Sequence, residues 1–373
     1  MIEDKRRYDI DWLRVIAILA VYLHHVGMPF NGDDFHIMNS DSSKILDDIM
    51  VFFEQFRLPL LFLISGTGTM FAFSKRTWFQ FLKERSTRLL IPLLFGVLFI
   101  VPPQTYFENI IKYDFYINVY KKGDFFEVNH LWFIENLFIM SVVLIPLILF
   151  LKSTRSNNLI NLLKTITSKR YGIFLWVLPL ILITVFLKKI YPSDSKDIIN
   201  LSSTFYYGYF FVCGMLFTAT ENIWIHLKSY RKFNFMAFLI SFLLFYGYYL
   251  MPSDVITPYL SLSNRWDIWY LVCALVGWNF VTTLLGYGQI WFNKKSVLLK
   301  KCNEAIYPFY ILHQTILIIL GYYIIQLNMS IVSKMFLLVL TSFPIIIIIY
   351  RLLIYPFKIP RILFGMKKKN KSY

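Results

Sequence analysis

Apolar residues form ten long runs along the chain of 373 residues, and short polar stretches separate these runs. Each run has about the 20 residues that an α-helix needs to cross the hydrocarbon core of a bilayer. The pattern therefore predicts an all-α, polytopic membrane protein with about ten transmembrane helices. The expected spans are 10–28, 50–73, 89–107, 131–151, 172–190, 201–220, 233–251, 267–286, 303–326 and 332–355.

Composition supports a membrane protein over an ordinary soluble domain. Hydrophobic residues make up 57% of the chain and aromatic residues 19%, whereas soluble domains are roughly half apolar. The longest polar loop, 108–130, is too short to bury a core of its own. We therefore expect a single transmembrane domain over residues 1–373.

Positive charge is unevenly distributed between the predicted loops. If the ten helices alternate in direction, about two thirds of the 38 lysines and arginines fall on the side that holds both termini. Because cytoplasmic loops carry the excess of Lys and Arg, we expect a multi-pass protein of the cell (cytoplasmic) membrane with both termini cytoplasmic and a basic cytoplasmic tail at 367–373. Topology and attraction to membrane lipid headgroups then account for the net charge of +16, and nucleic-acid binding is not indicated.

Ionisable residues interrupt the first apolar run. His25 follows Arg14 by eleven residues, which is about 1100° of helical rotation and roughly 16 Å of rise. The two side chains are therefore expected on one helix face, near opposite membrane surfaces. His24 is rotated away from that face. Charged groups inside a span usually face a bundle interior or a wet cavity, which favours a functional pair over simple contact with headgroups.

Further ionisable residues are expected at a similar outer depth. Glu54 and Arg57 fall in the outer part of the second span with i, i+3 spacing, where they could pair. The fourth span begins outside, which places His130 at the surface and Glu135 about one turn further in. His313 is expected near the middle of the ninth span. A cluster of histidines and carboxylates on the outer side follows from these depths.

The inner side instead carries arginines, among them Arg14, Arg85 and Arg88. Forked guanidinium groups match phosphate geometry, so they suit a polyanionic cytosolic donor. A histidine with a pKa near the working pH suits a general base for attack on a thioester, and a carboxylate can fix its tautomer. The layout therefore suits acyl transfer across a membrane.

Five segments in order along the chain resemble the acyltransferase-3 superfamily of integral membrane acyltransferases. They are the Arg-x10-His of the first span, FRLPLLFLISG at 56–66, the Arg85 and Arg88 run, HLWFIENL at 130–137 and YPFYILH at 307–313. The opening YDIDWLR and the HLWF segment are most similar to the branch that contains the periplasmic glucan succinyltransferase. One departure is Thr67, which stands where the family usually has an aromatic residue after Ser-Gly.

The resemblance implies an enzyme that moves an acetyl or succinyl group from cytosolic acyl-CoA to a hydroxyl of an extracytoplasmic glycan. His25 would be the catalytic base, with Arg14 as its paired arginine. No metal is expected, and the three cysteines show no metal-ligand spacing. The expected site residues are His25, Glu135 and Arg14 for catalysis, Arg14, Arg85, Arg88, Ser65 and Gly66 for the acyl-CoA donor, and Glu54, Arg57, His130, Trp132 and His313 for the acceptor.

Other interpretations stay open for several of these residues. Ser65 and Gly66 could instead allow close helix packing, as small residues do in membranes, and Trp132 could belong to the aromatic belt at the interface. Intramembrane His, Glu and Arg residues also occur in secondary transporters and proton-coupled channels. An N-acetyltransferase acting on an amino sugar would keep the same fold with a different acceptor.

Overall fold

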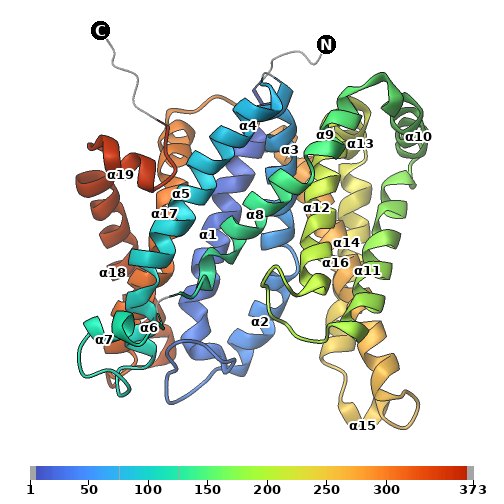
Figure 1. Cartoon of the computed structure of the whole chain (residues 1–373). Coiled ribbons are helices and arrows are strands. Elements are labelled where there is room, and N and C mark those ends of the chain that lie inside the picture. The colour runs from blue at the N-terminus through green and yellow to red at the C-terminus, as the bar shows by residue number, and fades with distance from the viewer. Residues whose placement is uncertain (1–5, 75, 125, 368–373) are drawn as a thin grey trace. The chain divides into compact units, whose positions relative to one another are not determined.

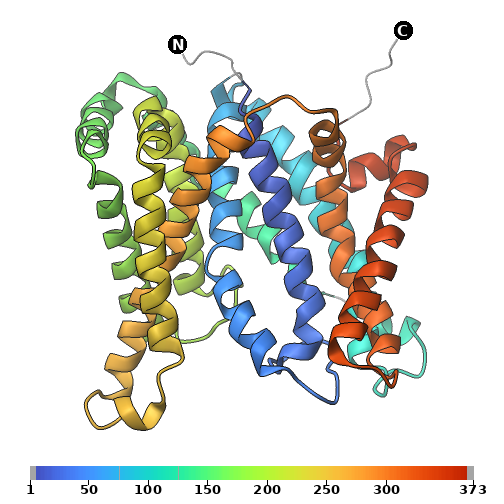
Figure 2. The ribbon, with the colours of Figure 1, turned by 180° about the vertical axis from the view of Figure 1, so that it is seen from behind.

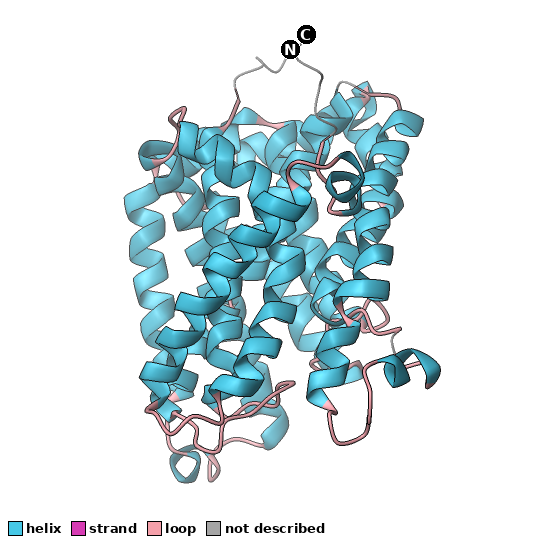
Figure 3. Ribbon diagram, turned by 90° about the vertical axis from the view of Figure 1, so that its left-hand side faces the viewer, coloured by secondary structure: helices cyan, strands magenta, loops and turns pink. Residues whose placement is uncertain are grey.

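The computed structural model describes residues 6–74, 76–124 and 126–367. Within these ranges every regular element is a helix, and no strand occurs (Figure 3). The expected all-α, polytopic fold is therefore confirmed. The predicted basic tail lies, apart from Lys367, outside the described residues.

The described chain divides into two compact units, each discontinuous in sequence. Figure 1 labels the helices of both. The first unit comprises Met1–Arg14, Gln55–Thr77 and Val143–Lys295, and the second comprises Val15–Glu54, Trp78–Val142 and Ser296–Tyr373. Helix α1 (Tyr8–Asn31) begins in the first unit and continues in the second. The expectation of one domain over residues 1–373 stays a prediction.

Close packing of two helix backbones organises the first unit. A Cβ atom on Gly66 of α3 would lie 1.9 Å from the carbonyl oxygen of Phe211, and one on Gly214 of α12 would lie 1.9 Å from that of Leu63. Thr67 also crosses this contact, because its hydroxyl donates to the Gly214 carbonyl at 3.1 Å. The helices of the unit are α3 (Arg57–Ser74), α9 (Ile145–Lys152), η4 (Thr154–Ser156), α10 (Asn157–Ser168), η5 (Gly172–Trp176), α11 (Val177–Ile190), α12 (Leu201–Ala219), α13 (Glu221–Ser229), α14 (Arg231–Tyr249), α15 (Ser253–Ile256) and α16 (Leu262–Trp291).

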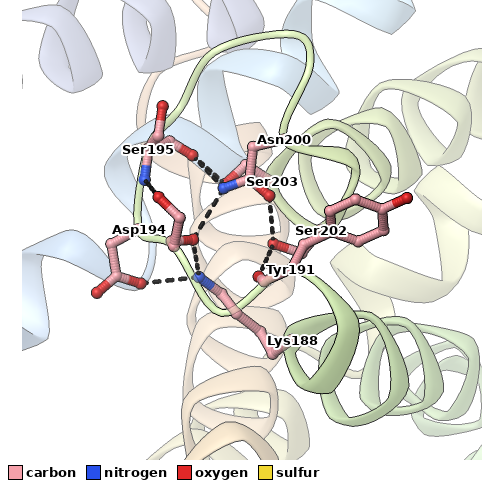
Figure 4. A network of polar contacts seen from close by, with 8 residues as sticks. Lys188, Tyr191, Asp194, Ser195, Asn200, Ser202 and Ser203 are labelled. Carbon is pink, nitrogen blue, oxygen red and sulfur yellow. Dashed lines mark hydrogen bonds and ion pairs between the residues drawn. The ribbon is translucent and has the colours of Figure 1, made fainter.

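Aromatic side chains and a polar loop complete the first unit. Helices α14 and α16 run side by side (Figure 2), with the rings of Phe238 and Phe280 4.5 Å apart. The loop between α11 and α12 is held by Asn200, whose amide donates to the carbonyl oxygens of Ser193 at 2.8 Å and Ser195 at 2.6 Å (Figure 4). Lys188 adds an ion pair with Asp194 at 2.7 Å. The loop thus satisfies its polar groups without regular secondary structure.

The second unit is built around α1 and α17. Its other elements include a long composite span in which two π-helical segments interrupt the α-helix. The elements after α1 are α2 (Lys44–Glu54), α4 (Trp78–Arg85), η1 (Ser86–Leu90), α5 (Ile91–Phe95), η2 (Gly96–Ile100), α6 (Pro102–Glu108), α7 (Ile117–Lys121), η3 (Asn129–Leu131), α8 (Trp132–Val143), α17 (Val297–Ile324), α18 (Ile331–Ile349), η6 (Tyr350–Ile354) and α19 (Lys358–Leu363).

The composite span has two free backbone carbonyls near its end. Pro102 has no N–H to donate to Leu98, four residues earlier, and the Leu98 carbonyl accepts from the Tyr120 hydroxyl at 2.9 Å. The Gln104 N–H donates to Val101 and not to Ile100, so the Ile100 carbonyl accepts from the Thr315 hydroxyl at 2.7 Å. Non-helical backbone in a membrane needs such internal partners. The irregular segment therefore positions side chains of other elements.

Seven helices of the described residues are long and apolar enough to cross a membrane, and the number rises to nine if each of two bent pairs forms one span. The expected span 233–251 forms α14, which is not among them. The expected span 50–73 contains a turn at Gln55 and Phe56 between α2 and α3. The seven helices that are long and apolar enough to cross a membrane are Tyr8–Asn31, Lys44–Ser74, Trp78–Glu108, Gly172–Ile190, Leu262–Trp291, Val297–Ile324 and Ile331–Ile354.

Candidate active site

The centre of the candidate site is a contact between two histidines of the second unit. Nδ1 of His25 on α1 lies 2.8 Å from Nε2 of His313 on α17. The second ring nitrogen of His313, Nδ1, hydrogen-bonds to the carbonyl oxygen of Tyr310. Because a carbonyl only accepts, His313 carries its proton on Nδ1, and its Nε2 accepts from Nδ1–H of His25. Neutral His25 therefore presents an unprotonated Nε2.

The surroundings fix both rings and leave one of them accessible. His313 is 1% exposed and His25 is half-buried. The rings of His25 and His313 stack at 14°, with centroids 5.1 Å apart. Phe35, in the loop after α1, stacks on His25 at 6.2 Å. This packing restricts the rotation of the His25 ring while part of its surface stays open.

A second polar chain of the same unit starts at the end of the composite span. The carboxylate of Glu108 accepts from Nδ1 of His36 at 2.6 Å. Nε2 of His36 is then an acceptor, and the Gln314 amide nitrogen donates to it at 3.0 Å. The same amide nitrogen donates to the side-chain oxygen of Gln104 at 3.2 Å. Gln314 adjoins His313 in sequence, so α17 takes part in both chains.

Gln104 connects this chain to His130. Its amide nitrogen donates to the hydroxyl of Thr315 at 2.6 Å and to Nδ1 of His130 at 3.2 Å. Nε2 of His130 donates to the carbonyl of Ile311 at 3.1 Å, which is consistent with an unprotonated Nδ1. Gln104 is fully buried, and both of its amide protons are used. The direction of each hydrogen bond thus sets the tautomer of His130.

The side chain of His130 is buried among protein groups, with 4% of it exposed, and its expected depth at the outer membrane surface stays a prediction. Asn129 has a φ of 48° and begins a single 3-10 turn, η3. This turn directs the imidazole inward to Gln104 and Ile311. Trp132 and Glu135 follow on α8, both half-buried. The roles expected for these two side chains stay predictions.

A turn at Gln55 and Phe56 places Glu54 and Arg57 on different helices, and the pairing expected for them stays a prediction. Glu54 ends α2, and its carboxylate lies 3.4 Å from Nε2 of His24. Arg57 begins α3 in the first unit and is 3% exposed. The structure therefore brings the Glu54 carboxylate to His24, within the second unit.

The arginines expected to bind the donor occur in both units. Arg14 lies on α1, in the part of that helix assigned to the first unit, and it donates to Asp11 at 3.2 Å. Arg85 and Arg88 are half-buried near the start of the composite span of the second unit, roughly 25 Å of helix rise from Gln104. Tyr307 of α17 lies within electrostatic range of both. Among the described residues, its buried hydroxyl has no hydrogen-bond partner.

Helix packing explains why residue 66 is a glycine, because the α12 backbone fills the space that a side chain would need. Ser65 is half-buried on the same helix, α3, and its expected donor role stays a prediction. Within the described residues, no group of three or more His, Cys, Asp or Glu side chains is placed to hold a metal ion.

Sequence reasoning missed several members of the polar chains, namely His36, Gln104, Tyr310, Gln314 and Thr315. Two signals were present in the sequence. Gln104 directly follows Pro102 and Pro103 in an apolar run, and Gln314 and Thr315 follow His313 in the middle of another. Polar side chains within a span are costly unless they have partners, so each of them indicated a buried network.

Comparison with known proteins defines the class of this protein. Residues 7–351 match a family model described as an acyltransferase domain, which confirms the acyltransferase-3 resemblance, and the chain belongs to this family. With its apolar helices, the protein is a membrane acyltransferase.

Individual relatives carry one name in common. Glucans biosynthesis protein C of Escherichia coli strain K12 is 23% identical over 344 residues, which cover 86% of this chain and 84% of the relative. The protein of the same name from Shigella dysenteriae serotype 1 gives the same identity and coverage, and that of Escherichia coli O157:H7 strain EC4115 is 22% identical. No solved structure matches the chain.

Proposed function

We propose that this protein transfers an acyl group from acyl-CoA to a hydroxyl of an extracytoplasmic glycan, with His25 as the general base. One observation carries the proposal: the directed contact from His25 Nδ1–H to His313 Nε2, which leaves His25 Nε2 without a proton. A base oriented by a third group is the arrangement that activates hydroxyl nucleophiles in acyl transfer.

The reaction balances with these groups. Nε2 of His25 takes the proton of the acceptor hydroxyl as its oxygen attacks the thioester carbonyl carbon. The tetrahedral intermediate collapses, the carbon–sulfur bond breaks, and the proton passes from His25 to the departing thiolate of coenzyme A. His313 keeps the His25 ring in one tautomer during both steps, and no metal is needed for either.

Arg85 and Arg88 serve the donor in this proposal. Guanidinium groups bind phosphates in a forked geometry, and Tyr307 adds a buried hydroxyl near both arginines. The excess of Lys and Arg on the predicted cytoplasmic side supports an orientation in which this end of the composite span faces cytosolic acyl-CoA. The opposite end of that span, with Glu108 and Gln104, then faces the acceptor.

The glycan acceptor is supported by the relatives named glucans biosynthesis protein C. We infer an O-acyltransferase because their name refers to glucans, whose free groups are hydroxyls. A secondary transporter or proton-coupled channel would share the buried histidines but would release no coenzyme A.

The test is reconstitution in proteoliposomes loaded with acetyl-CoA or succinyl-CoA labelled in the acyl group. Neutral glucans and amino sugars are offered outside, and the label on each is measured together with coenzyme A released inside. We expect label on the glucan and an equal amount of free coenzyme A. Label on the amino sugar alone that resists mild alkali, which cleaves esters but not amides, would assign N-acylation. The absence of transfer from both donors would refute the proposal.

A further inference from the structure

A cavity of about 690 Å³ lies in the first unit, at the start of α1, and none of the site residues discussed above lines it. Its walls come from the residues that lead into α1, from α13, from the start of α14 and from the end of α16. Four cations line it, Arg6, Arg7, Lys228 and Arg231, together with one carboxylate, Glu221. Its volume is within the usual range of small-ligand sites.

The wall formed by Arg7 is held in place by neighbours. Arg7 donates to both carboxylate oxygens of Asp9, at 2.9 and 2.6 Å, and Asp9 is fully buried. The guanidinium also lies over the Trp224 ring, 4.1 Å from its centroid. Gln289 donates to the Trp224 carbonyl at 3.1 Å. A fixed cation loses little side-chain entropy when an anion binds, so this wall is preorganised.

Helix α13 gives the cavity an amphipathic rim. It bends away from α12 by 100°, as helices that lie in the membrane interface do. Ile225 on this helix is 56% exposed, while Lys228, one turn further on, lines the cavity with it. An exposed apolar side chain beside a cationic cavity suits a ligand that carries a phosphate at one end and is apolar at the other.

We propose that this cavity binds the phosphate of an anionic ligand, with Lys228 and Arg231 as principal contacts beside the fixed Arg7. Basic pockets between transmembrane helices bind phospholipid headgroups. Two ligands supply this chemistry: an anionic phospholipid, and the nucleotide end of acyl-CoA. The second source rests on the function proposed above, and the first does not.

Binding to the purified full-length protein in a neutral detergent tests the proposal. The probes are phosphatidylglycerol, phosphatidylcholine as the net-neutral comparison, and adenosine 3′,5′-bisphosphate. We expect phosphatidylglycerol or the bisphosphate to bind at least ten-fold more tightly than phosphatidylcholine. Preference for the lipid identifies a headgroup site, and preference for the bisphosphate identifies a nucleotide site.

Variants assign the binding to the cavity. The double variant Lys228→Gln, Arg231→Gln should weaken binding of the preferred probe at least ten-fold, while Lys232→Gln, an exposed neighbour outside the lining, should leave it unchanged. If the double variant does not fold, salt dependence of the wild-type affinity replaces it, because binding by four cations must weaken steeply between 50 and 300 mM salt. Equal binding of all three probes, an unaffected double variant, or salt-independent affinity would overturn the proposal. The readout is binding, so it stays separate from any failure of acyl transfer.

Discussion

His25 and His313 share one hydrogen bond, 2.8 Å long, between Nδ1 of the first ring and Nε2 of the second. His313 therefore occupies, beside the proposed base, the place that a carboxylate holds in many catalytic triads. The sequence had suggested Glu135 for that place. A neutral imidazole can fix the tautomer of His25 as a carboxylate does, but it stabilises the imidazolium less, because it carries no charge.

The first prediction concerns the base itself. His25→Ala should lower acyl transfer about 100-fold or more, the usual contribution of acid–base catalysis, while the protein still inserts and folds. His24→Ala is the matched control, because His24 is the adjacent residue and contacts Glu54. The measurement is transfer rate in proteoliposomes. Equal losses in both variants, or near-normal transfer by His25→Ala, would remove His25 from the mechanism.

The second prediction separates orientation from base strength at His313. His313→Ala removes the acceptor of the His25 Nδ1–H, so turnover should fall at least about ten-fold with donor affinity unchanged. His313→Gln supplies an amide oxygen that can accept the same proton and should restore part of the turnover. Rate and donor affinity are measured for both variants. Identical turnover for Ala and Gln would show that hydrogen-bond acceptance at 313 does not matter.

The third prediction concerns the buried amide of Gln104. Gln104→Leu removes a donor for His130 and Thr315 and an acceptor for Gln314, which leaves buried polar groups unsatisfied. We expect a loss of about 1–3 kcal/mol in the free energy of unfolding for the groups left without partners. Thermal unfolding in detergent measures it. Gln326→Leu is the control, since Gln326 is exposed. A similar loss of stability in both variants would show that the polar network does not contribute.

The fourth prediction tests the donor end of the site. Arg85→Lys or Arg88→Lys keeps the charge but loses the forked geometry, so acyl-CoA affinity should weaken by about 1–3 kcal/mol. Lys83→Arg, an exposed position on α4, is the comparison. The affinity is obtained by titrating acyl-CoA into the purified variants. If the wild type and all three variants gave the same binding curve, acyl-CoA would bind elsewhere.

The fifth prediction is a pH dependence in the loop at 109–128. The Lys112 ammonium and the Tyr113 hydroxyl, which both bind Asp124, hold the pKa of that carboxyl below its ordinary value. A lowered folded-state pKa means that the contact stabilises the loop above the ordinary carboxyl pKa and is lost as the pH falls through the lowered one.

Limited proteolysis of this loop between pH 7 and pH 3, with an acid-active protease, checks the fifth prediction. Cleavage in the wild type should increase only near the acidic end of the range. Asp124→Asn should be cleaved readily at every pH, and Asp114→Asn, an exposed carboxylate in the same loop, should behave as the wild type. Unchanged cleavage of Asp124→Asn would mean that the ion pair does not order the loop.

Local patterns in the sequence were sufficient for the all-α membrane fold, and the choice of His25 as the base stays a prediction. Apolar runs predicted the spans, and helical spacing selected His25 over His24. The turn between α2 and α3 was missed because Pro59, in the first turn of α3, was not taken as the start of a new helix. The buried hydrogen bonds of His130 were not predicted, because the positive φ of Asn129 turns the imidazole inward and an ideal helix would not. The partners of His313 and Gln104 are remote in sequence, and no local pattern encodes them.

Helix α17 contributes consecutive groups to both polar chains, from Tyr310 and Ile311 to His313, Gln314 and Thr315. A slide of this helix by one residue, about 1.5 Å along its axis with a rotation of about 100°, would break all of these contacts at once. These contacts therefore hold α17 in one axial position, and the helix is unsuited to act as a moving gate. We therefore expect an acyl chain to enter by displacement of elements other than α17, and cross-links that immobilise α17 should leave turnover intact.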